Sequence, residues 1–69
     1  MKLQQIVGKS CVSQLIRNRV EHQSFYSAAT AQQMIQREFP NHVVKENGDQ
    51  IAVMVRDKSF AVAVFKQVS

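Results

Sequence analysis

Hydrophobic and polar positions follow a helical period in the first part of the chain. In residues 10–23 the apolar residues recur at spacings of three and four, as on one face of a helix. Ser10 precedes this run and is a residue type favoured at the N-cap. The positions expected to face the core are Cys11, Val12, Leu15, Ile16 and Val20.

A second helical period runs through SAATAQQMIQREFP, residues 27–40. Ser27 is the expected N-cap, and the pair Thr30 and Gln33 offers an alternative capping box one turn later. Pro40 ends the helix, because the residue before a proline is pushed away from helical angles. The apolar positions of this helix are Ala28, Ala31, Met34, Ile35 and Phe39.

The residues before Lys9 fit two structures. Leu3, Ile6 and Val7 suit either a backward extension of the first helix or a separate strand. Gly8 inside a helix would cost about 1 kcal/mol relative to alanine. The pattern leaves this choice open.

After Pro40 the period changes to two, which indicates strands. Asn47-Gly48 separates two such runs and is typical of a tight hairpin turn, and a further turn is expected at Asp57-Lys58. The predicted strands cover residues 42–46, 50–56 and 59–67. The expected fold class is α+β, with two N-terminal helices packed on one face of a three-stranded antiparallel meander. Residues 1–69 are expected to form a single small domain.

The two turns determine which strand residues share a face, because successive side chains of a strand alternate. With Val44 opposite Ile51, and Val53 opposite Val62, one face is expected to be the core face. Its members are Val44, Ile51, Val53, Val55, Phe60, Val62 and Val64. The other face has a small, apolar centre, which is typical of a patch that meets a partner. The expected protein interface consists of Val43, Ala52, Met54, Ala61, Ala63 and Phe65.

Two alternatives concern this second face and the last strand. Alternatively, the N-terminal segment of the same chain packs across the alanines and covers this face. The last strand is uncharged over SFAVAVF, and an unguarded edge of that kind is normally covered. Either Met1–Val7 pairs with it or another chain does.

Charge adds a second candidate surface. The net charge is +4, and residues 1–20 carry all of it, because they hold four basic residues and no acid. This basic stretch also fits a targeting segment, although its removal would leave about 49 residues for a core. Alternatively it contacts nucleic acid or an acidic partner, or is simply a solvated helix face. The candidate contacts are Lys9, Gln14, Arg17, Asn18 and Arg19.

Residues for catalysis are not indicated. Cys11 and His22 would lie about 16 Å apart along one helix, too far for a thiol–imidazole pair. No metal-ligand spacing, paired carboxylates or phosphate-binding loop is visible, so we expect no enzyme, cofactor, metal or small-molecule substrate. A lone cysteine suits a reducing compartment, and we expect a cytoplasmic protein with no membrane association.

The sequence therefore favours a small non-enzymatic binding protein of regulatory or inhibitory kind. We expect it to act by protein–protein contact through the apolar sheet face or the edge strand, with another protein or with itself as a homodimer. The alternative is nucleic-acid binding through the basic N-terminal helix. No motif is specific enough to indicate a family.

Overall fold

The computed structural model describes residues 1–68 and contains two helices and a four-stranded antiparallel sheet. In chain order the elements are β1 (Lys2–Gly8), α1 (Cys11–Val20), α2 (Ala28–Glu38), β2 (His42–Asn47), β3 (Gln50–Val55) and β4 (Ala61–Val68). The strands lie in the order β1-β4-β3-β2. The α+β class is confirmed. The expectation of three strands was wrong, because β1 precedes both helices and adds a fourth strand.

The N-terminal segment forms a separate strand, β1, and not a backward extension of α1. It pairs antiparallel with β4, so that Lys2 lies opposite Val68 and Gly8 opposite Ala63. β4 is therefore an inner strand, and the N-terminal segment covers the edge that the sequence left unguarded. Gly8 permits a close approach, since a Cβ there would lie 2.6 Å from Nε2 of Gln5.

Both helices begin with the expected cap. Ser10 Oγ accepts the backbone N–H of Ser13, and Ser13 Oγ accepts that of Ser10, which makes a reciprocal capping box. Ser27 Oγ accepts the backbone N–H of Thr30, so α2 begins at the first of its two expected caps. α2 ends two residues before Pro40, as the proline predicts.

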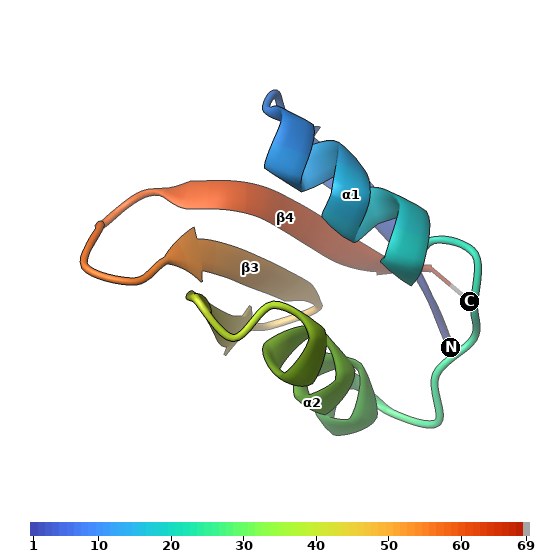
Figure 1. Ribbon diagram of the computed structural model, residues 1–69. Helices are drawn as coiled ribbons and strands as arrows, with labels where there is room; N and C mark the ends of the chain where they lie inside the picture. The colour runs from blue at the N-terminus through green and yellow to red at the C-terminus, as the bar shows by residue number, and fades with distance from the viewer. Residues whose placement is uncertain (69) are drawn as a thin grey trace.

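The helices form one layer and the sheet the other. α1 lies over β1 and β4, and α2 lies over β2, on the same side of the sheet (Figure 1). The core fills the space between the two layers. Its buried apolar residues are Leu3, Ile16, Val20, Phe25, Ala31, Met34, Ile35, Ile51, Val53, Ala63 and Phe65.

The buried stripe of α1 differs from the predicted one. Leu15 is 59% exposed, and Cys11 and Val12 are also exposed, so these three expectations of core residues were wrong. Ser13 is fully buried instead, on the same stripe as Ile16 and Val20. A serine can occupy this place because its hydroxyl donates to the Ser10 carbonyl and accepts the Ser10 N–H, so no polar group is left unpaired.

The first hairpin keeps its predicted faces with a shifted register. Asn47 pairs with Gln50, so the turn residues are Gly48 and Asp49 rather than Asn47 and Gly48. Val44 consequently lies opposite Val53 and not Ile51. A shift of two residues leaves each side chain on the same face. Gly48 has the positive φ, 63°, that such a turn needs.

The second hairpin contains a β-bulge that reverses the predicted faces of β4. Val53 lies opposite Ala63 and Met54 opposite Ala61, so Val62 is an extra residue in β4. Beyond this bulge Ala63 and Phe65 turn toward the helices, where both are fully buried. Their assignment to the exposed interface was therefore wrong.

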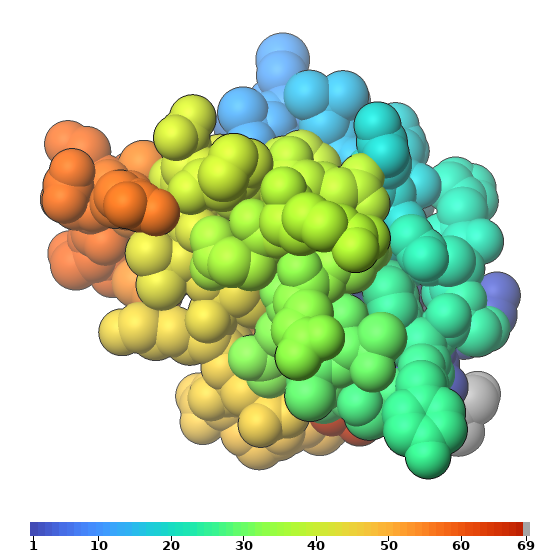
Figure 2. Space-filling model, turned by 60° about the horizontal axis from the view of Figure 1, so that its bottom comes forward, coloured from blue at the N-terminus to red at the C-terminus, as the bar shows by residue number. Residues whose placement is uncertain are grey.

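Two residues assigned to the core face also need correction. Val64 alternates with Ala63 and Phe65 and so points away from the helices, where it is half-buried. Phe60 is 58% exposed, because it belongs to the loop between β3 and β4 and not to the sheet. This loop stands out from the body of the molecule as the orange projection in Figure 2.

Candidate functional site

The candidate site is the face of the sheet that points away from the helices, here called the outer face. Its members follow from the strand register and from the alternation of side chains along each strand. They form transverse rows that run across the strands. The first row is polar and consists of Gln4, Lys66, Gln50 and Asn47. The next row is Val7, Val64, Ala52 and Lys45, followed by Ala61, Met54 and Val43.

The second and third rows create an apolar patch, defined here as Ile6, Val7, Val43, Ala52, Met54, Ala61 and Val64. A register shift in β1 between Gln5 and Val7 places Ile6 and Val7 side by side at the edge of this patch. Each of these two side chains is 47% exposed. The other members are half-buried, since their neighbours on the strands cover them in part. Aliphatic side chains grouped in this way favour contact with another molecule over contact with water.

Two hollows lie at the end of the patch nearest the β3–β4 loop. One has a volume of about 280 Å³ and is lined by Val7, Lys9, Ser10, Phe60, Ala61 and Val62. The other has a volume of about 110 Å³ and is lined by Val43, Lys45, Met54, Val55, Asp57 and Lys58. Val7 and Ala61 in the first hollow, and Val43 and Met54 in the second, belong to the patch. The patch thus offers two shallow recesses, each with at least one lysine at its wall.

The charges around the patch are mostly of one sign. Lys2, Lys45 and Lys66 occupy outward positions of the strands, and none of the outward strand positions within residues 1–68 carries an acid. Within residues 1–68, Asp57 is the one acid that lines either hollow, where it accompanies Lys45 and Lys58. The outer face therefore attracts negative charge.

Four of the six residues predicted for the protein interface meet on this face: Val43, Ala52, Met54 and Ala61. Sequence reasoning missed Ile6, Val7, Val64 and Lys66. The adjacent apolar pair Ile6-Val7 breaks the alternation of β1, and this break was the available signal for a bulge there. No such signal existed in β4, because AVAVF is apolar in either parity.

The other predicted surface lies on α1 and the residue before it. Lys9, Gln14, Arg17, Asn18 and Arg19 are all exposed. The structure also gives both arginines acidic partners: Arg17 Nε lies 3.2 Å from Glu21 Oε1, and Arg19 bonds to Glu38 of α2. The arginine side chains remain 56% and 65% exposed, so these pairs reduce the positive charge of α1 without burying it.

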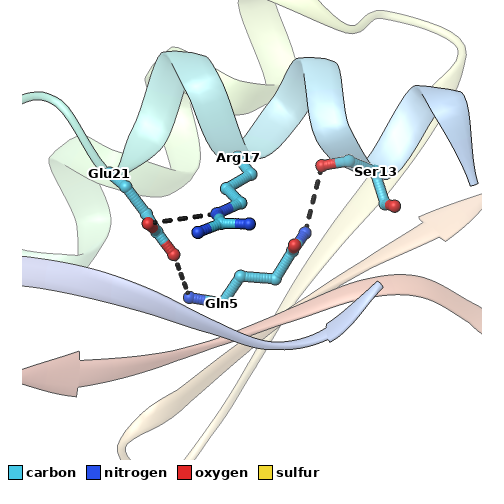
Figure 3. A network of polar contacts seen from close by, with 4 residues as sticks. All are labelled: Gln5, Ser13, Arg17 and Glu21. Carbon is cyan, nitrogen blue, oxygen red and sulfur yellow. Dashed lines mark hydrogen bonds and ion pairs between the residues drawn. The ribbon is translucent and has the colours of Figure 1, made fainter. Parts of the chain in front are cut away.

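Glu21 links α1 to the free edge of β1 (Figure 3). Its Oε2 accepts the backbone N–H of Gln5 at 2.7 Å, and the Gln5 side-chain amide donates to the Ser13 carbonyl at 3.0 Å. The hydrogen bond from Gln5, together with Arg17, holds the pKa of the Glu21 carboxyl below its ordinary value of 4.5.

The same edge is closed further along by the segment between the helices. Met1 and Phe25 exchange two backbone hydrogen bonds, one from the terminal amine of Met1 and one from the N–H of Phe25. With Glu21 on Gln5, these contacts occupy part of the free edge at the start and middle of the N-terminal segment. The edge of β1 is therefore partly occupied by contacts within the chain, whereas neither helix covers the outer face, which is the better candidate.

Comparison with protein-family models, with curated proteins and with solved structures finds no match for this chain. Within residues 1–68, no group of three or more His, Cys, Asp or Glu side chains is placed to hold a metal ion. Neither helix in that range has the length and apolar content needed to cross a membrane.

Proposed function

We propose that this protein is a small non-enzymatic binding protein, of regulatory or inhibitory kind, that holds another polypeptide against the outer face of its sheet. The observation that carries this proposal is the apolar patch, which neither helix covers. Burial of aliphatic surface contributes about 25 cal/mol per Å², so a partner that dries the patch gains affinity from it.

The experiment is a selection of random 16-residue peptides on the immobilised protein, followed by affinity measurements on the selected peptides by fluorescence anisotropy. Met54→Lys should weaken binding at least tenfold, because a lysine would place an unpaired charge in a dry contact. Gln33→Lys adds the same charge at an exposed position of α2 and should change the affinity less than twofold.

Two controls test whether a loss of binding reflects the patch and not a loss of folding. Circular dichroism should show that both variants are folded, and Met54→Gln provides a neutral substitution if the lysine perturbs the sheet. Peptides that bind Met54→Lys and Met54→Gln as tightly as the parent would place binding elsewhere and end the proposal.

Nucleic-acid binding through α1 is the second candidate function. It is supported by the exposure of Arg17 and Arg19 beside the polar side chains Gln14 and Asn18. Affinity for a duplex should fall with salt at a log–log slope of about 0.9 per phosphate contacted. Replacing both arginines by glutamine should lower the affinity and this slope. Binding that is absent at low salt, or unchanged in the double variant, rules out this candidate.

A further inference from the structure

The lysines around the apolar patch indicate what kind of polypeptide it receives. Lys45 extends the second row at its β2 end, and Lys66 stands in the adjoining polar row. Lys9 and Lys58 line the two hollows at the other end. These four residues, here called the lysine frame, surround the patch on several sides. Asp57 shares the smaller hollow with Lys45 and Lys58, and within residues 1–68 it forms an ion pair with neither.

We infer that the partner is an amphipathic helix whose apolar stripe is flanked by acidic residues. This inference rests on the proposed function, since it concerns the same surface. An apolar stripe would cover the patch, and carboxylates on either side of the stripe would meet the lysine frame. Four strands at about 4.8 Å spacing make a face roughly 14 Å wide between the outer strands, which accommodates a helix about 10 Å in diameter.

The same features argue against a second copy of this chain as the occupant. Two identical patches meeting about a twofold axis would bring one lysine frame against the other. Like charges in such a contact oppose association, and the outward strand positions contain no acid that could pair with them.

They also argue against a nucleic acid on this face. The centre of the patch is aliphatic, with Val64, Ala52 and Met54 at its middle. Bases are normally held on aromatic side chains, and none of the outward strand positions carries one. The exposed aromatic beside the patch, Phe60, lies in the loop at its end and not at its centre. Phosphates would satisfy the lysines but leave the apolar rows uncovered.

Three synthetic helical peptides of 16 residues test the inference. The first has leucines at positions i, i+3, i+4 and i+7 with glutamates beside them. The second replaces the glutamates by lysines, and the third keeps the glutamates but replaces the leucines by serines. The first peptide should bind the parent protein at least tenfold more tightly than either of the others, and raising the salt concentration should weaken it.

Variants of the protein assign this binding to the frame and the patch. Lys45→Glu should lower the preference for the acidic over the basic peptide at least fivefold. Arg37→Glu is the matched control, because it makes the same charge reversal at an exposed site of α2 that has no ion-pair partner in the described structure. It should leave the preference unchanged. Met54→Lys should abolish binding of the first peptide.

The outcomes separate this inference from the proposed function. If the basic peptide binds as tightly as the acidic one and Met54→Lys removes both, the patch binds polypeptides but the acidic partner is wrong. If no synthetic or selected peptide depends on Met54, both proposals fail. A dimer seen by sedimentation equilibrium and lost in Met54→Lys overturns the inference in favour of a second copy. If a labelled 20-nucleotide RNA displaces the acidic peptide from the parent protein and does not bind Lys45→Glu, the inference is overturned in favour of a nucleic acid.

Discussion

The two faces of the sheet carry similar side chains, but one face is buried and the other is partly exposed. On the inner face Ile51, Val53 and Phe65 are fully buried beneath the helices. On the outer face Ile6 and Val7 are each 47% exposed, and apolar side chains extend across all four strands. Hydrophobicity alone does not distinguish these two sets, because both consist largely of aliphatic residues. What distinguishes them is the parity of each strand, and a single bulge residue changes that parity.

The faces also differ in how charge is arranged. In the helix layer Arg17 and Arg19 each have an acidic partner, so the positive charge of these two residues is offset locally. On the outer face Lys45 and Lys66 have no acid at any neighbouring outward position. Of the two surfaces, the outer face is therefore the more strongly unbalanced in charge, and Lys2 of the basic N-terminal stretch lies on it.

The largest effect is expected from neighbours in β3 that point to opposite faces. Val53→Lys should unfold the protein, at a cost of about 4 kcal/mol or more, because it buries a charge without a partner. Met54→Lys should cost about 1 kcal/mol or less, since the side chain can reach water. Urea titrations followed by circular dichroism measure both. Equal costs would mean that the two faces are equally covered and that the outer face is not free.

A second pair of neighbours tests the bulge at Val62. Phe65→Ala should cost about 3–5 kcal/mol, as expected for removal of a buried ring, whereas Val64→Ala should cost about 1 kcal/mol. Thermal and urea unfolding give both values. A larger cost for Val64→Ala than for Phe65→Ala would indicate that β4 has no bulge and that Val64, not Phe65, faces the helices.

Glu21 tests the charge balance of the helix layer. Glu21→Gln should lower the free energy of unfolding by about 1 kcal/mol at pH 7, because it weakens the hydrogen bond from Gln5 and removes the Arg17 pair. The pKa of Glu21 is depressed in the folded state, so its contribution is present above 4.5 and lost as pH falls through the folded pKa. The difference between parent and variant should therefore shrink below about pH 4.5.

The control for this measurement is Glu46→Gln, at an exposed site of β2 without an ion-pair partner in the described structure. It should leave the stability at pH 7 nearly unchanged. If the difference in free energy of unfolding between the parent and Glu21→Gln stays constant down to pH 3, the ionised carboxylate of Glu21 is not what stabilises its contact with β1.

A similarly small effect is expected at the turn that sets the faces of the first hairpin. Gly48→Ala should cost about 1 kcal/mol, because Gly48 has a positive φ while a Cβ there would meet no neighbouring atom within 4 Å. Gly48→Asn should cost less than half as much, since asparagine tolerates this conformation. Melting temperatures that are equal for all three proteins would show that the turn is not held in the left-handed region.

The elements fixed by local chemistry were predictable. Ser10 and Ser27 satisfy free N–H groups within three residues, and Pro40 acts on the residue before it. Gly48 likewise permits the first turn through its own backbone. Each of these signals is contained in a short window of sequence. For that reason the helices and the first hairpin appear close to where the sequence places them.

The remainder depends on contacts between distant residues. The strand character of Lys2–Gly8 arises from its pairing with β4, and Leu3, Ile6 and Val7 alone fit a helix equally well. The exposed position of Leu15 reflects how α1 is rotated on the sheet, to which the Gln5 and Glu21 contacts contribute. Ala52 and Met54 precede the bulge and lie on the face expected from the sequence, whereas Ala63 and Phe65 follow the bulge and lie on the opposite face.

The pairing of β1 with β4 has a consequence for the order of folding. Lys2 and Val68 come from opposite ends of the described chain, so their contact closes the longest loop in the fold. The hairpins joining β2, β3 and β4 need only short loops, and such local contacts generally form before distant ones. Until β1 docks, β4 is an open apolar edge. At high protein concentration another copy can then place its own β1 there, which would give exchanged dimers during refolding.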